Sequence, residues 1–301
     1  MSLPKDVFEK HQRAGKITRE VREKMRSFVR EGMPIIEVCE EAEGLIREKG
    51  GQLAFPCNVS INEVAAHYTS PPNDKRVIPP NSLVKVDLGT HLDGYIADTA
   101  VTICFNPEHE NLVRAAEEAL KVAVKTVYAG ISTSKLGSAI EKTIKTYGGC
   151  KPVSNLTGHQ IGRYLIHTGK SIPNVSHLIG SKIREGEVVA IEPFVTVANA
   201  AGKVRNGDET TIFRFVKRRL LKNSYAKHLL DYVEENFRTL PFSERWLKKV
   251  VPKEQYFAAF QELLRSKCLM SYPVFIEASG KPVAQAEHTL LIVKNGCRVL
   301  T

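Results

Sequence analysis

The chain has 301 residues, and its 43 Lys and Arg outnumber its 33 Asp and Glu, which gives a formal net charge of +10. Hydrophobic residues make up 43% and charged residues 25% of it, a balance that excludes a disordered or collagen-like chain. No apolar run reaches the roughly 18 residues that a membrane span needs, and the highly charged N-terminal stretch excludes a secretory signal. We therefore expect a cytoplasmic protein without a membrane partner, built as two domains or as one large domain with an insertion.

The N-terminal third is predicted to form two helices followed by short strands. Residues 7–31 have the apolar periodicity of an amphipathic helix, and Gly32 ends it. Pro34 begins a second helix, because its missing N–H costs nothing in the first helical turn. The apolar segments that follow are separated by prolines and by an Asp-Gly pair, and they are predicted as strands at 59–69, 83–89 and 95–105.

The rest of the chain alternates between helices and strands. Asn106 and Pro107 cap a helix that continues to residue 128, and residues 134–147 are predicted as another helix. Further strands are predicted at 188–197, 274–276 and 283–293. Pairs of strands flanked by pairs of helices indicate an α+β or mixed α/β core. The six cysteines lie far apart and lack the spacing of a zinc site, which predicts free thiols.

Residues 209–268 differ from the rest of the chain in composition. They hold 13 Lys and Arg against 7 Asp and Glu, and they also hold 10 of the 22 aromatic residues. Their apolar periodicity is helical and breaks at Pro241 and Pro252. We expect a small helical insertion with its own apolar core, inside a main domain that is made of residues 1–208 and 269–301.

The strongest local signal for chemistry is a pair of aspartates on a predicted hairpin. Asp87 lies in Val-Lys-Val-Asp-Leu-Gly, and Asp98 follows a turn signal at Asp93-Gly94. A turn centred on residues 92 and 93 would place the two aspartates directly opposite each other, with Cβ atoms about 5 Å apart on one face. Carboxylates that close need a raised pKa or a bound cation. The alternative is that both acids lie on a solvated face of the hairpin.

Three further residues strengthen the prediction of a metal site. His159 lies between Gly158 and Gly162, which indicates a crowded site, although a structural histidine is an alternative. Glu192 and Glu287 each lie in an otherwise apolar run, and an unpaired buried carboxylate costs several kcal/mol, so a counter-ion is expected. Either glutamate could instead pair with Lys or Arg. Four carboxylates and one imidazole suit a pair of Mn, Fe, Co or Zn ions better than one structural zinc.

With their local contexts, these five positions resemble the methionine aminopeptidase family, whose α+β fold is called the pita bread. The resemblance extends over essentially the whole chain, and the helical insertion is similar to that of the type II subfamily in its archaeal form. The pieces that carry it are Ala-Ala-His67-Tyr-Thr, Val-Asp87-Leu-Gly, Ala-Asp98-Thr-Ala, Gly-His159-Gln-Ile-Gly, Ile-His167, Ile-Glu192-Pro-Phe and Glu287-His-Thr. The resemblance implies two divalent metal ions. Asp98 and Glu287 would bridge them, His159 and Glu192 would hold one, and Asp87 would hold the other.

The resemblance also implies a reaction, which is removal of the N-terminal methionine from nascent polypeptides whose second residue is small, by attack of a metal-bridging hydroxide on the first peptide bond. Glu192 would relay a proton, His167 would stabilise the tetrahedral oxyanion, and His67 would contact the scissile amide. Phe55 and Ile166 lie beside these motifs and would line the methionine pocket. Without the resemblance, both histidines and Phe55 would be assigned to the core.

Two other functions fit parts of the sequence. Prolidases and Xaa-Pro aminopeptidases use a similar set of five ligands, but they resemble longer chains with an additional N-terminal domain. Non-catalytic relatives of the fold bind RNA or ribosomes, typically after losing metal ligands that are all present here. The basic clusters at 217–219 and 248–249 are therefore either a solvated helix face or a patch for ribosomal RNA. We expect a monomer whose partners are nascent N-termini and, through that patch, the ribosome, but not DNA.

Overall fold

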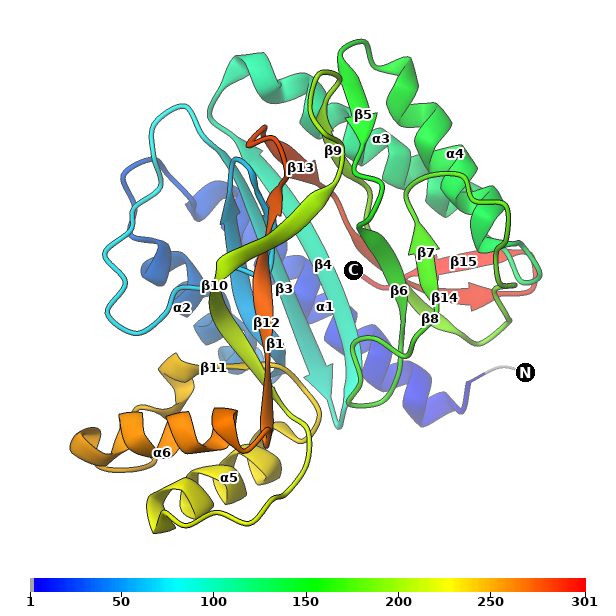
Figure 1. The fold of residues 1–301 in the computed structure, drawn as a ribbon. Coiled ribbons are helices and arrows are strands. Elements are labelled where there is room, and N and C mark those ends of the chain that lie inside the picture. Colours follow the sequence, from blue (N-terminus) through cyan, green and yellow to red (C-terminus); the bar gives the residue numbers. More distant parts are fainter. Residues whose placement is uncertain (1–2) are drawn as a thin grey trace.

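The computed structural model describes residues 3–301 as a mixed α and β protein (Figure 1). Its α-helices are α1 Lys5–Phe28, α2 Ile35–Glu48, α3 Glu110–Thr126, α4 Thr133–Thr146, α5 Ser224–Phe237 and α6 Lys253–Arg265. The first strands are β1 Gln52–Ile61, β2 Val64–Ala66, β3 Leu83–Leu92, β4 Tyr95–Cys104, β5 Cys150–Pro152, β6 Thr157–Ile161 and β7 Ser171–Pro173. They are followed by β8 Val188–Ile191, β9 Phe194–Val197, β10 Val204–Phe215, β11 Phe242–Ser243, β12 Leu269–Glu277, β13 Val283–Gln285, β14 His288–Val293 and β15 Gly296–Val299. None of the helices in this described range is long and apolar enough to cross a membrane.

The N-terminal half of the protein is an antiparallel sheet covered by two helices. Its strands pair in the order β1-β3-β4, with α1 packed on β3 and β4 and α2 packed on β1. Each helix turns one apolar stripe toward the sheet, and Ile17, Val21 and Met25 form the stripe of α1. This helix ends at Phe28, before the predicted end at residue 31, because the β-branched Val29 already has an extended backbone with a ψ of 132°.

The hairpin of β3 and β4 has a different register from the one predicted. Gly89 pairs with Asp98, so Asp87 is a diagonal neighbour of Asp98 and does not lie directly opposite it. The turn is centred on Asp93 and Gly94, whose φ values of 51° and 84° both lie in the left-handed region. These are the conformations of a tight type I′ hairpin turn, for which Asp-Gly is a preferred sequence. The predicted opposition was therefore wrong, although diagonal positions differ by two residues and still share a face.

The other half of the protein consists of two sheets that exchange strands. One sheet has the order β13-β9-β5 and the other β15-β14-β8-β6-β7, and α3 and α4 pack against them. The chain passes from the second sheet to the first between β8 and β9, and it returns between β13 and β14. The runs predicted as single strands are therefore each broken in two, at Glu192-Pro193 and at Ala286-Glu287. The first break is expected of proline, which has no N–H to donate to a strand ladder.

The helical insertion lies at the end of a long two-stranded ribbon (Figure 1). The ribbon is formed by β10 and β12, and β11 pairs with β10 near the helices. α5 and α6 pack on each other, and their apolar cluster includes Leu229, Leu230, Ala259, Phe260 and Leu263. Helix was predicted from residue 209, but β10 continues to Phe215 and the first helix begins at Ser224. The stretch Thr-Thr-Ile-Phe-Arg-Phe favours a strand, because β-branched and aromatic side chains suit a pleated surface.

Candidate metal centre and substrate pocket

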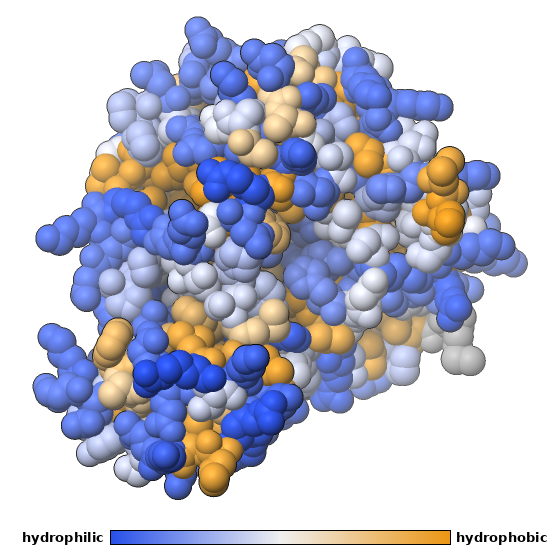
Figure 2. Space-filling view, viewed as in Figure 1, coloured by the Kyte–Doolittle hydropathy of each residue, from blue (hydrophilic) through white to orange (hydrophobic). Residues whose placement is uncertain are grey.

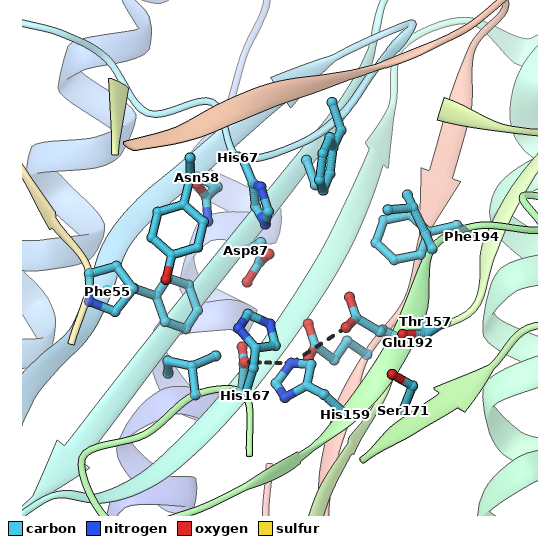
Figure 3. Close-up of a pocket in the computed structure, with 18 of the residues that line it drawn as sticks. Phe55, Asn58, His67, Asp87, Thr157, His159, His167, Ser171, Glu192 and Phe194 are labelled. Atoms are coloured by element: carbon cyan, nitrogen blue, oxygen red, sulfur yellow. Dashed lines mark ion pairs between the residues drawn. The ribbon is translucent and has the colours of Figure 1, made fainter. Parts of the chain in front are cut away.

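A cavity of about 250 Å³ is lined by residues from both halves of the fold (Figure 3). All nine residues predicted for the site line it, namely Phe55, His67, Asp87, Asp98, His159, Ile166, His167, Glu192 and Glu287. They come from four strands, from two loops and from the two places where the chain changes sheet. Figure 2 shows the molecular surface hollowed near the centre of this face. The fold thus brings together residues that are far apart in the sequence.

Four carboxylates and one imidazole form the polar end of the cavity. The potential ligand atoms of Asp98, His159 and Glu287 all lie within 4.8 Å of one another. Nε2 of His159 is 3.5 Å from Oε1 of Glu192 and 3.7 Å from Oδ2 of Asp98. Asp87 faces the same space from β3 (Figure 3). Since Asp98 is only 3% exposed, the alternative of two acids on a solvated hairpin face is wrong.

Burial makes this group of side chains costly to charge. It raises the pKa of Asp87 to about 7. Burial, together with repulsion between neighbouring carboxylates, also raises the pKa values of Asp98, Glu192 and Glu287 well above the usual range. The same burial lowers the pKa of His159 well below its usual value, so its imidazole is neutral at pH 7. Without a cation the group must hold protons, which a divalent ion would displace.

The set of donor atoms fits divalent cations. Oδ1 of Asp87 and Oδ1 of Asp98 are buried and have no hydrogen-bond partner within residues 3–301, and orphaned acceptors of this kind are rare in folded proteins. Over the same range, neither Glu192 nor Glu287 forms an ion pair with Lys or Arg, so the alternative pairing of these glutamates is not found. Carboxylate oxygens combined with one imidazole nitrogen suit Mn, Fe, Co or Zn.

Gln285 supports two of the carboxylates and was missed in the sequence. Its buried Nε2 donates to Oε2 of Glu192 at 3.1 Å and to Oε2 of Glu287 at 3.5 Å. It precedes Glu287 by two residues, and alternation along an extended chain is the signal that could have identified it. Thr289 has a related role. Its Oγ1 accepts a hydrogen bond from the backbone N–H of Asp98 and donates one to the backbone carbonyl of Asp98, and these two bonds join β14 to β4.

His67 and His167 reach the cavity from loops. His67 follows β2 with a φ of 65°, which lies in the left-handed region that few residues other than glycine adopt. Its ring centroid is 4.5 Å from that of Phe275, and burial lowers its pKa to about 4. The ring centroid of His167 is 4.3 Å from that of His159, and burial lowers the pKa of His167 as well. Both imidazoles are therefore neutral hydrogen-bonding groups beside the carboxylates.

The rest of the cavity wall is largely apolar. Phe55 and Ile166 lie there together with residues that the sequence did not single out, namely Leu156, Phe194, Ile212, Pro241, Tyr272 and Phe275. Because Pro241 lies between α5 and β11, the insertion contributes to the wall. Asn58 was also missed. It is 4% exposed, it pairs with Asp87 across β1 and β3, and its Oδ1 has no hydrogen-bond partner among the described residues.

The basic clusters of the insertion are not part of the cavity wall. Residues 217–219 and 248–249 are exposed to solvent. One member of the first cluster, Arg218, makes surface ion pairs with Asp231 and Glu234 of α5. The six cysteines carry free thiols, as predicted.

Comparisons with known proteins agree with these features. A sequence profile of metallopeptidase family M24 matches residues 9–213. The chain is 43% identical to the methionine aminopeptidase of Methanothermobacter thermautotrophicus over 298 residues, which cover 98% of this chain and 99% of that protein. The structure of a thermophilic Arx1 matches with a TM-score of 0.85 at 22% identity, covering 99% of this chain and 91% of that one. The crystal structure of the methionine aminopeptidase from Thermotoga maritima matches with a TM-score of 0.72 at 21% identity, covering 100% and 98% of the two chains. At these identities the two structures show the fold alone.

Proposed function

This chain belongs to the methionine aminopeptidases of metallopeptidase family M24, and from this premise we propose that it removes the N-terminal methionine from nascent polypeptides whose second residue is small. It is a metallo-aminopeptidase, a hydrolase, with the α+β pita-bread fold that the sequence resemblance implied. One observation carries the proposal. All nine predicted residues line one cavity, whose buried carboxylates form no ion pair with Lys or Arg in the described part of the chain.

The metal centre of the proposed enzyme would hold two divalent ions, of Mn, Fe, Co or Zn. Asp98 and Glu287 would contribute to holding both ions, His159 and Glu192 would hold one of them, and Asp87 would hold the other. When bound, the ions supply a water of lowered pKa as the nucleophile. Glu192 would serve as the proton acceptor beside that water. Gln285 binds Oε2 of this glutamate and so orients its carboxylate at the junction of β8 and β9.

His67 and His167 act on the substrate as neutral hydrogen-bond donors. His67 donates to the scissile amide, and His167 stabilises the oxyanion that develops on the substrate carbonyl. Burial supports these roles, because it lowers the pKa of both imidazoles and keeps them uncharged at pH 7. In an enclosed site, a hydrogen bond to developing charge is worth more than it is in water.

The methionine side chain occupies the apolar part of the cavity. Phe55 and Ile166 form part of that wall, which suits an unbranched thioether side chain. In an N-terminal residue the free amino group, the side chain and the carbonyl of the first peptide bond are attached to the same Cα atom. With the side chain in the apolar part of the cavity, the free amino group therefore lies near the carboxylates. A bulky second residue would clash at the rim of the cavity.

Hydrolysis of short peptides tests this function. Metal-stripped protein is assayed on Met-Ala-Ser with and without added Mn²⁺ or Co²⁺, and Met-Lys-Ser, Leu-Ala-Ser and Ala-Pro-Ser are run beside it. We expect metal-dependent release of methionine from Met-Ala-Ser alone. Cleavage of Ala-Pro-Ser instead would assign the prolidase reaction. No cleavage of any peptide by protein with bound metal would reject the proposal and favour the RNA-binding alternative.

The exposed basic segment 217–219 is proposed to bring the enzyme to its substrates at the ribosome, in the cytoplasm. Arg218 is paired with Asp231 and Glu234, but Lys217 and Arg219 are exposed and can approach phosphates, and such contacts weaken steeply as salt rises. The test is co-sedimentation with ribosomes at increasing salt, with wild type and with Lys217→Glu/Arg219→Glu. We expect the variant to leave the ribosomal pellet at lower salt. Equal co-sedimentation of both proteins would reject this partner surface and assign the cluster to a solvated face.

A further inference from the structure

A buried ion pair joins the helical insertion to the rest of the protein. Arg245 lies on the short 3₁₀ helix Glu244–Leu247 of the insertion, Glu43 lies on α2, and their side chains are 4% and 2% exposed. Nη2 of the arginine donates to Oε1 at 2.7 Å and Nη1 to Oε2 at 3.2 Å. Nε1 of Trp246 also donates to Oε2, at 2.8 Å. In a buried ion pair, the cost of desolvating the two charges cancels much of their electrostatic attraction, so a gain in stability alone does not explain this ion pair.

The same guanidinium holds the segment that follows His67. Nε of Arg245 donates to the carbonyl of Ser70 at 2.6 Å, and Nη2 donates to Oγ1 of Thr69 at 3.1 Å. Oγ1 of Thr69 donates in turn to the carbonyl of Cys57 at 2.7 Å. Thr69 and Ser70 are fully buried, so no water competes for these hydrogen bonds. The arginine therefore connects the insertion directly to a chain segment beside the cavity.

The partner carboxylate holds a second segment of the cavity wall. The N–H of Cys57 donates to Oε1 of Glu43 at 3.2 Å. Cys57 lies on β1 between Phe55 and Asn58, which both line the cavity. One ion pair thus fixes the segment with Phe55 and the segment with His67 relative to each other.

The backbone of His67 depends on such support. Its φ of 65° is a conformation that a residue with a side chain adopts only where the surroundings impose it. The surroundings here are hydrogen bonds to the next residues. The N–H of Thr69 donates to Oγ1 of Thr211 at 3.2 Å, and the carbonyl of Tyr68 accepts from the N–H of Val59 at 2.7 Å. Arg245 completes this anchoring from the side of the insertion.

We propose that Arg245, paired with Glu43, is a positioning residue of the aminopeptidase that holds the His67 segment in the conformation that directs the imidazole into the cavity. The inference rests on the proposed function, because it needs the role assigned to His67. Because Arg245 belongs to the insertion, the proposal gives the insertion a role in catalysis. Lys cannot replace the arginine, because a point charge does not reach a carboxylate, a hydroxyl and a carbonyl at once.

A double-mutant cycle tests the proposal. Arg245→Lys keeps the charge and is combined with His67→Ala, and kcat and KM for Met-Ala-Ser are measured at saturating Mn²⁺. We expect Arg245→Lys alone to lower kcat about tenfold and to change KM less than about twofold. In the His67→Ala background it should cause no further fall, because both changes act on one imidazole. An equal fall in both backgrounds would overturn the proposal.

Arg265→Lys is the matched control, because this arginine is exposed in the last turn of α6, and it should keep the wild-type kcat. Bound Mn²⁺ should be unchanged in Arg245→Lys, since the hydrogen bonds of this arginine go to Glu43, Thr69 and Ser70 and not to the metal-binding set. A lowered melting temperature with unchanged kcat would assign Arg245 a structural role only and overturn the proposal.

Trp246→Phe serves if Arg245→Lys does not fold. It removes the indole hydrogen bond to Glu43, keeps an aromatic ring against Phe237, and should lower kcat about threefold, again only where His67 is present. Failure of wild type to cleave Met-Ala-Ser rejects the proposed function itself. A cleaving wild type with additive variants rejects only the positioning role.

Discussion

Next to the four buried carboxylates lie three polar side chains that are uncharged at pH 7, those of His67, His167 and Gln285. Burial lowers the pKa of His67 and of His167, and Gln285 carries an amide that does not titrate. Replacing one of these residues with an uncharged one therefore removes hydrogen bonds without changing the net charge of the side chains around the carboxylates. The effects of such replacements on metal binding and on turnover can be separated.

For His67→Ala we expect kcat for Met-Ala-Ser to fall about 10²-fold or more, because a donor aimed at the scissile amide is lost. Mn²⁺ binding, measured by titration calorimetry, should match that of wild type, since the imidazole is not among the five residues proposed to bind metal. Turnover at the wild-type rate would remove His67 from the mechanism.

Gln285→Leu should weaken Mn²⁺ binding about 10- to 100-fold, as is usual when a partner that orients metal-binding carboxylates is removed. The variant keeps much of the side-chain volume but loses the donor to Glu192 and Glu287. Gln255→Leu, at an exposed position on α6, is the control and should bind Mn²⁺ as wild type does. The same calorimetric titration checks both, and equal affinities would contradict the supporting role of Gln285.

Charged residues of the site could be recognised in the sequence, while its amides could not. Glu192 and Glu287 are conspicuous because an acid in an apolar run must be neutralised, whatever the fold. Asn58 and Gln285 carry no charge, so no cost of burying a charge marks them, and the alternation of Gln285 with Glu287 is the one local signal. Their position depends on which strands face each other, and that follows from the whole fold.

Among the elements, the two changes of sheet shape the metal centre. Glu192 and Glu287 occupy the two short connections between the same pair of sheets, so both carboxylates leave the strand ladders at one edge. The runs around them were predicted as single strands, because apolar β-branched residues continue on both sides of each break. A local pattern identifies such strands, but not which sheet each one joins.

The β3–β4 turn gives a prediction about stability. Gly94→Ala should lower the free energy of unfolding by about 2 kcal/mol, because a side chain is strained at a φ of 84° and its Cβ would lie 2.3 Å from Cδ2 of Tyr164. Denaturant unfolding measures the effect. Gly44→Ala is the control, since it lies in α2 with open space around it and should be neutral or stabilising by up to about 1 kcal/mol. Equal stability of Gly94→Ala and wild type would contradict the turn geometry.

For the whole molecule, stability depends on whether the carboxylate cluster holds protons or metal. The folded-state pKa of Asp87, about 7, lies above its usual value. In metal-free protein, its stabilising contribution to the free energy of unfolding is therefore complete below about pH 4 and is lost as the pH rises through 7. Asp98, Glu192 and Glu287 shift in the same direction. Bound metal removes this loss, because it stabilises the ionised carboxylates.

The gain in melting temperature on adding Mn²⁺ should therefore increase between about pH 5.5 and pH 8. Buried Lys85 and His91 and half-buried His288 also titrate with pH, but they lie outside the proposed metal-binding set and titrate in both forms, so the difference between metal-loaded and metal-free protein isolates the cluster. Calorimetry at matched pH values measures that difference. A gain that stays constant or shrinks over this range would show that metal does not displace protons from these carboxylates.

The distribution of the cluster along the chain also sets when the enzyme can first work. Asp87 and Asp98 are synthesised well before Glu287, and β14 must still pair with β8 and bind β4 through Thr289. A chain that is still growing therefore has two acids on a finished hairpin but lacks the last carboxylate that closes the cluster around a cation. Such a chain lacks one of the carboxylates that the proposed reaction needs, so the proposed activity begins only after Glu287 has been synthesised and β14 has paired.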